Sequence, residues 1–156
     1  MSDLVLRRAT PDDVPRLVEL YAEDMLGQGR EATGADDLPV YREAFARVDA
    51  DPSTTLFVAE REGRVVGTFQ LTITPGLASR GVVRATVEAV RIEAAQRGRG
   101  LGSAMMRLAV EEAARRGADA VQLTSNKART EAHRFYETLG FKRSHEGFKL
   151  DLPRRR

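Results

Sequence analysis

The 156-residue chain contains no cysteine, which excludes disulfides, thiolate zinc sites, iron–sulfur clusters and a thiol nucleophile. It also has no tryptophan, and aromatic residues make up only 6% of it. The interleaved basic and aromatic side chains of a nucleic-acid-binding surface are therefore missing. With two histidines the chain cannot form a histidine-rich metal site. Carboxylate ligands would remain, but we predict no metal centre.

Long hydrophobic runs and a strong charge of one sign are also absent. No segment approaches the ~18 consecutive apolar residues of a membrane-spanning helix. The first residues, Met1 to Leu4, lack the basic and apolar stretches of a signal peptide. The 25 basic and 23 acidic residues leave a net charge of +2, too small to attract nucleic acid strongly. We therefore predict a cytoplasmic protein with neither membrane nor nucleic-acid partners.

The composition that is present suits one globular domain. Hydrophobic residues make up 42% of the chain and charged residues 31%, enough to bury a core without predicting disorder. No internal repeat and no Pro/Gly/Ser-rich linker divides it. We predict one domain over residues 1–153, followed by the basic tail Arg154–Arg156.

Hydrophobic periodicity predicts a mixed α/β fold of about 6 to 7 strands and about 4 helices. Thr10 and Pro11 mark the start of the first helix, and Gly27 lies where we expect it to have ended. Glu62 and Gly63 form the turn of a hairpin. Strands are predicted at 4–8, 55–60, 64–74, 84–93 and 120–124, with one or two more in 141–152; the later helices are predicted at 38–48, 101–117 and 130–139.

The most informative segment runs from Ile92 to Ser103, where a strand leads through a glycine-rich turn into an amphipathic helix. Glycine lets the backbone approach a ligand closely and adopt positive φ. The first amides of the helix have no partners within it, and its dipole adds partial positive charge. Arginines at 97 and 99 add full charges. These features predict a pyrophosphate site made by Gln96, Arg97, Gly98, Arg99, Gly100, Leu101, Gly102 and Ser103.

Two common nucleotide motifs do not fit this loop. The dinucleotide-binding fingerprint G-x-G-x-x-G follows the first strand of a βαβ unit, whereas this loop has Gly98-x-Gly100-x-Gly102 late in the chain. A Walker A loop needs Gly-Lys-Ser/Thr, which is absent. An ordinary strand-to-helix turn with helpful glycines remains the alternative.

The spacing Arg97-x-x-Gly100-x-Gly102 matches R/Q-x-x-G-x-G/A, the acetyl-CoA pyrophosphate motif, and the chain resembles the GNAT superfamily of N-acetyltransferases. The resemblance implies a mostly antiparallel central sheet with the motif between the fourth strand and the third helix. It also implies acetyl-CoA as cosubstrate, and it leaves a homodimer open because dimers are common in the family. It further implies that the fourth strand is splayed from the fifth, so that Val90, Arg91 and Ile92 line the pantetheine arm.

A second match lies further along, in Leu123–Asn126, Ala132–Glu137 and Leu139–Phe141. This run particularly resembles bacterial aminoalkylphosphonate and histone-acetyltransferase-like members of the family. The resemblance implies that Asn126 contacts the cofactor, although an asparagine also suits a strand-to-helix turn. It places Tyr136 at the position of the general acid for the departing thiolate, the alternative being a structural tyrosine.

Acetyl transfer also needs a base, because an ammonium group with a pKa near ~10 cannot attack. Glu88 alternates with Val87 and Ala89 on the predicted strand and is the best candidate; an exposed glutamate or a substrate-binding carboxylate is the alternative. In some family members the acidic residue that would serve as the base lies two positions earlier, where this chain has Thr86. Glu93 has the opposite strand parity to Glu88, which predicts the opposite face and makes it a less attractive base.

The sequence therefore predicts an acetyl-CoA-dependent N-acetyltransferase acting on a small-molecule or peptide amine by direct attack in a ternary complex. The alternative is a non-catalytic, acyl-CoA-binding regulatory module of the same fold. Turnover that depends on Tyr136 and Glu88 would distinguish the two, since both predict binding of coenzyme A.

Overall fold

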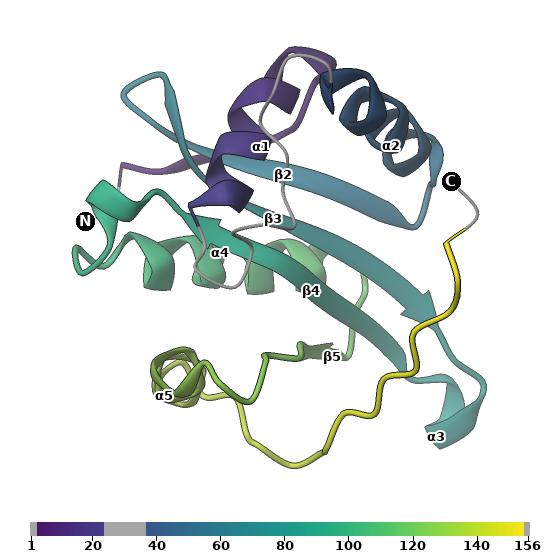
Figure 1. Cartoon of the computed structure of the whole chain (residues 1–156). Coiled ribbons are helices and arrows are strands. Elements are labelled where there is room, and N and C mark those ends of the chain that lie inside the picture. The colour runs from purple at the N-terminus through teal and green to yellow at the C-terminus, as the bar shows by residue number, and fades with distance from the viewer. Residues whose placement is uncertain (1–2, 24–36, 155–156) are drawn as a thin grey trace. The chain divides into compact units, whose positions relative to one another are not determined.

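The computed structural model of the chain describes residues 3–23 and 37–154. Their contacts gather in two compact units, Met1–Leu123 and Thr124–Arg156. The first unit carries the sheet and most of the helices, whereas the second carries one helix and an extended C-terminal segment (Figure 1). Within the described ranges no helix is long and apolar enough to cross a membrane.

The first unit is built on a five-stranded sheet whose spatial order follows the chain, β1-β2-β3-β4-β5. The first three neighbouring pairs are antiparallel, and β4 and β5 are parallel. The strands are β1 Val5–Arg8, β2 Thr54–Arg61, β3 Arg64–Pro75, β4 Val83–Ile92 and β5 Ala120–Gln122. Glu62 and Gly63, both with positive φ, form the predicted tight turn between β2 and β3.

The helices of the first unit begin and end largely where local signals predict. Pro11 opens the first helical turn, where its missing N–H is not needed, and the predicted end at Gly27 lies outside the described residues. Gly117, with a φ of +87°, follows the long helix α4. The helical elements are η1 Pro11–Asp13, α1 Val14–Ala22, α2 Leu38–Ala50, α3 Ala78–Gly81, η3 Ala94–Gln96 and α4 Leu101–Arg115.

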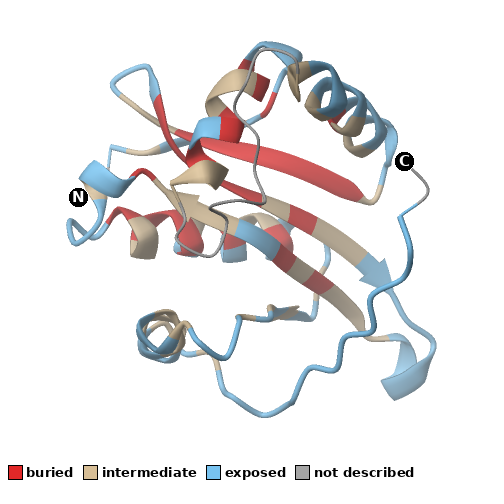
Figure 2. Ribbon diagram, viewed as in Figure 1, coloured by how far each residue is buried: buried red, intermediate tan, exposed pale blue. Residues whose placement is uncertain are grey.

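Helices cover the sheet on both faces, with α1 and α2 on one face and α4 on the other (Figures 1 and 2). Leu17 of α1 and Phe45 of α2 belong to one buried cluster with Val58 of β2. On the α4 face, Gly67 of β3 lies so close to Met105 that a Cβ there would come within 2.8 Å of the Met105 sulfur. Burial on both faces explains why β2 and β3 are the most buried strands in Figure 2.

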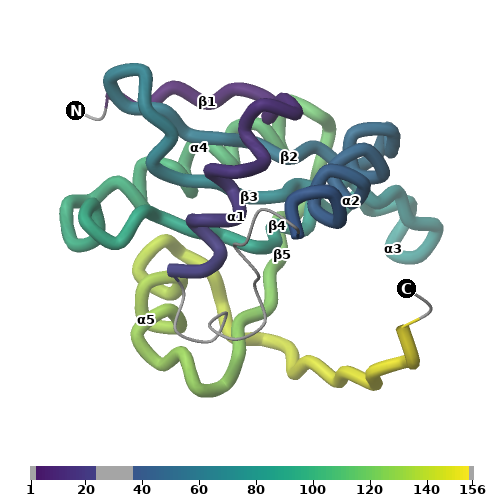
Figure 3. Tube along the Cα trace, turned by 45° about the horizontal axis from the view of Figure 1, so that its top comes forward, coloured from purple at the N-terminus to yellow at the C-terminus, as the bar shows by residue number. Residues whose placement is uncertain are grey.

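The second unit contains helix α5, Thr130–Thr138, followed by Gly140 with a φ of +96°. Gly140 directly follows the C-cap residue Leu139, a position where a left-handed residue ends a helix without steric cost only when it lacks a Cβ. Figure 3 follows the chain from α5 into the extended C-terminal segment. Residues 141–154 form neither helix nor strand.

The prediction of about 6 to 7 strands was therefore too high for the described residues, whose ladders join five. The missing strands are those expected in 141–152. Phe148, Leu150 and Leu152 alternate as in a strand, yet they are 96%, 86% and 78% exposed. Alternation predicts a face but supplies no partner for the backbone hydrogen bonds that define a strand. The mixed, mostly antiparallel α/β architecture and the four predicted helices are confirmed, and the four-residue α3 was not predicted.

Candidate active site

Strand β4 leaves the regular ladder halfway along its length. On the β3 side, two residues, Ala89 and Val90, stand opposite Phe69 alone, so β4 carries a bulge. Ala89 has a φ of +51°, a conformation that favours glycine. On the other side, the ladder with β5 is restricted to Arg84↔Ala120, Ala85↔Val121 and Thr86↔Gln122. All three residues of β5 pair with β4, so the ladder between the two strands ends at Thr86, and the splay that the resemblance implies remains a prediction.

The bulge and the short ladder with β5 have a chemical consequence. From Val87 onward, the β4 edge on the β5 side has no ladder partner among the described residues. Backbone N–H groups that leave a ladder become available as donors for a ligand, and bulges often lie next to active sites for this reason. The predicted pantetheine-lining residues are half-buried: Val90 is the second residue of the bulge, and Arg91 and Ile92 follow it. Their contact with a cofactor remains a prediction.

Glu88 lies on the sheet face that α1 and α2 cover. It stands opposite Gln70 of β3, which stands opposite Leu56 of β2, and Leu56 belongs to the α1–α2 cluster. Residues directly opposite each other share a face. Arg91 also reaches this side, because its guanidinium lies 5.9 Å from the ring centre of Tyr21 in α1. Glu88 is exposed, as a carboxylate that exchanges protons with water must be.

The prediction that Glu93 lies on the opposite face from Glu88 was wrong. The Glu93 carboxylate meets Arg16 of α1, with 3.0 Å between Nη2 and Oε1. Strict alternation would have separated these two glutamates, but the bulge inserts one extra residue between them and shifts the alternation. Glu93 therefore differs from Glu88 not in its face but in its burial and in its partners.

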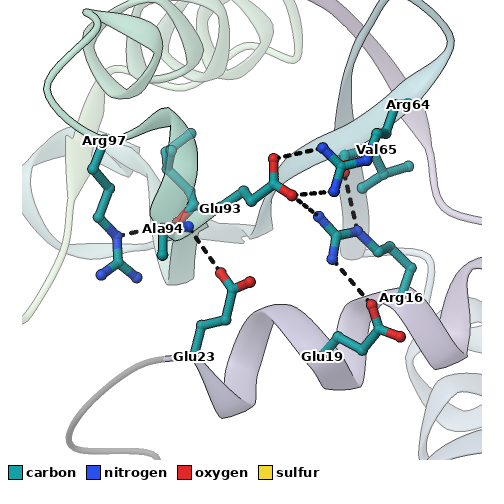
Figure 4. A network of polar contacts seen from close by, with 9 residues as sticks. Arg16, Glu19, Glu23, Arg64, Val65, Glu93, Ala94 and Arg97 are labelled. Atoms are coloured by element: carbon teal, nitrogen blue, oxygen red, sulfur yellow. Dashed lines mark hydrogen bonds and ion pairs between the residues drawn. The ribbon is translucent and has the colours of Figure 1, made fainter.

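Glu93 is 5% exposed and lies between two arginines (Figure 4). Arg64 of β3 donates from both terminal nitrogens to the two carboxylate oxygens, and Arg16 donates to one of them. Burial raises the pKa of the Glu93 carboxyl, but the hydrogen bonds and charges of Arg64 and Arg16 outweigh burial and leave the pKa below its ordinary value. A carboxylate held in its ionised form in this way is a poor general base.

The glycine loop between η3 and α4 is open. Gly98 and Gly100 have φ values of +78° and +79°, and a Cβ at either position would meet nothing within 4 Å. Gly100 is the N-cap of α4, and no side chain caps this helix end. Arg97 and Arg99 are exposed beside it, Arg97 donating from Nε to the Ile92 carbonyl at 3.3 Å. Uncapped amides, free space and two cations fit a pyrophosphate group.

The second unit holds Asn126 in a side-chain turn, in which Oδ1 accepts from the Ala128 N–H at 2.9 Å. His133 of α5 lies 2.9 Å from the Asn126 carbonyl through Nε2 and fixes the same turn. Asn126 therefore has the turn role that the sequence left open as the alternative to a cofactor contact. The turn uses the amide oxygen, and a contact of Asn126 with a cofactor remains a prediction.

Tyr136 is half-buried in α5 and packs edge-to-face against Phe135 and Phe141, with ring centres 5.2 and 5.9 Å apart. These contacts fix the ring and match the structural alternative for this residue. A fixed ring also suits a proton donor, so the general-acid role remains a prediction.

Sequence reasoning missed the residues that hold the start of the loop. Arg16 and Arg64 are separated from Glu93 by 77 and 29 positions along the chain, and no spacing rule connects them. Glu23 accepts from the Ala94 N–H at 2.9 Å across 71 positions. Among the described residues, no group of three or more His, Cys, Asp or Glu side chains could hold a metal ion.

A bulged strand thus leads through an open glycine loop into a helix N-terminus that has no side-chain cap. The chain matches the Acetyltransferase (GNAT) family over residues 14–141 and belongs to that family. The resemblance seen in the loop motif is thereby confirmed.

Three similar proteins cover nearly the whole chain. The aminoalkylphosphonate N-acetyltransferase of Salmonella typhimurium is 32% identical over 92% of this chain and 88% of its own length. The glucosamine 6-phosphate N-acetyltransferase of Trypanosoma brucei brucei is 31% identical over 96% of this chain and 97% of its own length. A crystal structure described as a transcriptional regulator from Bacillus halodurans C-125 is 43% identical, with a TM-score of 0.90 over 96% of this chain and 99% of that one.

Proposed function

We propose that residues 1–153 form one N-acetyltransferase domain that moves an acetyl group from acetyl-CoA to the amine of a small molecule or peptide. The observation that carries this proposal is the open junction at Gly100, where a helix begins without a side-chain cap beside two exposed arginines. Membership of the GNAT family and the two N-acetyltransferase relatives support it. The acyl donor supplies an activated thioester; the chain supplies binding, orientation and proton transfer.

The donor site is assigned to three parts of the chain. The loop and first helical turn, residues 96–103, donate backbone N–H groups to the pyrophosphate, and Arg97 adds charge. The backbone of residues 90–92 lines the pantetheine arm along the β4 edge that has no ladder partner in β5. Asn126 contributes its Nδ2 group.

The proton transfers are assigned to Glu88 and Tyr136. Glu88 takes a proton from the acceptor ammonium through water, which frees the amine to form the new C–N bond as the C–S bond breaks. Backbone N–H groups at the bulge stabilise the negative charge that develops on the acyl oxygen. The Tyr136 phenol gives its proton to the departing thiolate, and the second amine proton goes to solvent.

For the acceptor, we favour a small amine that carries a phosphate or phosphonate. Both N-acetyltransferase relatives are named for acceptors of this kind. Arg91, half-buried over the Tyr21 ring, puts a positive charge on the same face as Glu88, which suits such a group. Comparing 2-aminoethylphosphonate with ethylamine, and glucosamine 6-phosphate with glucosamine, tests the preference; equal turnover within each pair would contradict it.

The donor site is tested by calorimetric titration of acetyl-CoA into the wild type and Gly100→Glu. The variant places a side chain and a negative charge at the loop, so we expect affinity to fall about 100-fold or more. Gly63→Glu is the matched control, since Gly63 has a φ of +75° and equally open surroundings in the β2–β3 turn. Both variants carry a similar backbone cost of about 1 to 2 kcal/mol. No binding by folded wild type, or equal binding by Gly100→Glu, would refute the proposal.

A regulatory module that binds acyl-CoA without turnover is the second candidate, favoured by the description of the 43% identical structure as a transcriptional regulator. Turnover distinguishes the two. An enzyme should release free coenzyme A with an accepted amine, and Tyr136→Phe should lower kcat about 100-fold without weakening acetyl-CoA binding. Glu88→Gln should lower kcat most at neutral pH, where an amine is almost wholly protonated. Binding without turnover across an amine library would favour the regulator.

A further inference from the structure

Glu93 is a buried carboxylate to which the proposed reaction assigns no role. It is the first residue after β4, and its N–H donates to the Val66 carbonyl at 2.8 Å, which extends the contact with β3 by one residue. Its side chain lies between Arg16 of α1 and Arg64 of β3 (Figure 4). Burying a charge is costly unless it is paired, and here two arginines pair it.

The backbone that follows Glu93 is the turn that delivers the chain to the glycine loop. The Glu93 carbonyl accepts from the Gln96 N–H at 2.9 Å and closes η3. The next N–H, that of Ala94, donates to the Glu23 carboxylate at the end of α1. Arg97 is the residue that directly follows this turn. The path from Glu93 to the loop is therefore short and hydrogen-bonded.

We propose that Glu93 is a positioning residue for the pyrophosphate loop: by clamping the end of β4 to α1 and β3, it holds the η3 turn, and with it the amides and Arg97 of the loop, in the geometry that binds acetyl-CoA. This inference rests on the proposed function. It assigns no contact between Glu93 and the ligand, and it separates Glu93 from Glu88, which shares its face but is exposed.

Two features favour positioning over catalysis or over simple packing. Both carboxylate oxygens accept from guanidinium groups, which stabilise the ionised form and make Glu93 a weak acceptor of a proton from an amine. The ion pairs also join three elements, α1, β3 and the β4 end, at the one point where the chain leaves the sheet for the loop. Burial alone calls for a paired cation, whereas here cations from two separate elements meet the carboxylate.

The test compares Glu93→Gln with Asp13→Asn. Asp13 is a second buried carboxylate, 8% exposed, which bonds to Arg7 and Thr10 at the β1–α1 junction. Both substitutions keep the side-chain shape and remove the charge, so both should lower the melting temperature. Only Glu93→Gln should weaken acetyl-CoA binding, by about tenfold in Kd, because a small misplacement of binding groups is costly. Asp13→Asn should keep the wild-type Kd within about twofold.

Kinetics supply a readout that a purely structural role would not change. In Glu93→Gln the KM for acetyl-CoA should rise about tenfold while kcat at saturating donor changes less than about twofold, because the loop binds the donor but does not touch the reacting atoms. Glu93→Asp keeps the charge and should restore part of the affinity. Arg64→Gln, which removes a 59% exposed side chain, should weaken binding by a smaller factor and serves if Glu93→Gln does not fold.

The outcomes are distinct. A folded wild type that does not bind acetyl-CoA refutes the proposed function itself, whatever the variants do. Wild-type binding with an unchanged Kd in folded Glu93→Gln, or in Arg64→Gln where it substitutes, overturns the positioning role alone. An equal loss of affinity in Asp13→Asn also overturns it, because the effect would then follow stability rather than the place of the carboxylate.

Discussion

The β1–α1 and β4–α4 junctions are built from the same parts. In each, a strand passes through a short 3-10 turn into a helix, and a buried carboxylate pairs with arginine: Asp13 with Arg7, and Glu93 with Arg16 and Arg64. They differ in where that carboxylate lies. Asp13 sits within the first turn itself, whereas Glu93 precedes the glycine loop and holds the end of the strand.

This difference decides what each helix start can do. At the first junction Asp13 accepts from the Thr10 N–H at 2.7 Å, and Pro11 has no N–H to satisfy, so the chain closes the site with its own groups. At the second, Gly98 and Gly100 leave open space and α4 has no side-chain cap. One junction therefore contributes stability, and the other has the N–H donors that we propose for the pyrophosphate.

The largest effect should come from breaking the closed junction. Asp13→Asn removes a buried charge that pairs with Arg7 at 2.7 and 2.8 Å, and should lower the free energy of unfolding by about 2 to 3 kcal/mol. Urea unfolding followed by circular dichroism measures this loss. A loss below about 0.5 kcal/mol would show that the junction is not a stability element.

The same variant has a defined pH dependence. Hydrogen bonding by Arg7 holds the pKa of the Asp13 carboxyl below its ordinary value, although burial opposes this shift. A group whose pKa is lower in the folded state stabilises the fold above its unfolded pKa, about 3.9, and loses that contribution as pH falls through the folded value. The stability difference between wild type and Asp13→Asn should therefore be largest near neutral pH and shrink below about pH 4. A constant difference down to pH 2 would contradict this assignment.

A smaller effect should follow from removing charge at the open junction. Arg97→Ala should weaken acetyl-CoA binding about fivefold to tenfold and reduce its dependence on salt, because an exposed cation acts on the pyrophosphate through a screened field. Arg107→Ala, an exposed arginine further along α4, is the control and should leave the affinity unchanged. Titrations at two ionic strengths measure both quantities. Equal losses in the two variants would show that Arg97 acts only through net charge.

The smallest effect should come from Glu23→Gln. The variant replaces a charged acceptor of the Ala94 N–H by a neutral one at a partly exposed position, so stability should fall by less than about 1 kcal/mol and affinity by less than about threefold. Glu19→Gln, which alters a more exposed partner of Arg16, is the control. A larger affinity loss in Glu23→Gln than in Glu93→Gln would reverse the order of importance within this network.

Much of the fold followed from local patterns. The Glu62-Gly63 pair predicted a hairpin because glycine accepts positive φ readily, and both residues have a positive φ. Thr10 and Pro11 predicted a helix start for an equally local reason. The glycine loop was also placed correctly between a strand and a helix. The strands expected in 141–152 were not found, because their alternation indicates a face without specifying a partner.

The site was harder to predict where it depends on strand pairing. Nothing in the residue types of Ala89 and Val90 marks a bulge, which depends on how β3 and β4 align. Strict alternation therefore assigned Glu93 to the wrong face. The partners of Glu93 were equally hidden, since charged residues are common in this chain and any of several could have been its neighbour.

The sequence by itself determined the class of fold, the family and the position of the glycine loop, because turns, helix ends and short motifs depend on residues a few positions apart. Only the tertiary structure decided the bulge in β4, the face on which Glu93 lies and its pairing with Arg16 and Arg64, across 77 and 29 positions. The physical reason is that a buried charge is tolerated only where the assembled sheet and helix bring opposite charges to it, and that meeting is a property of the assembled fold.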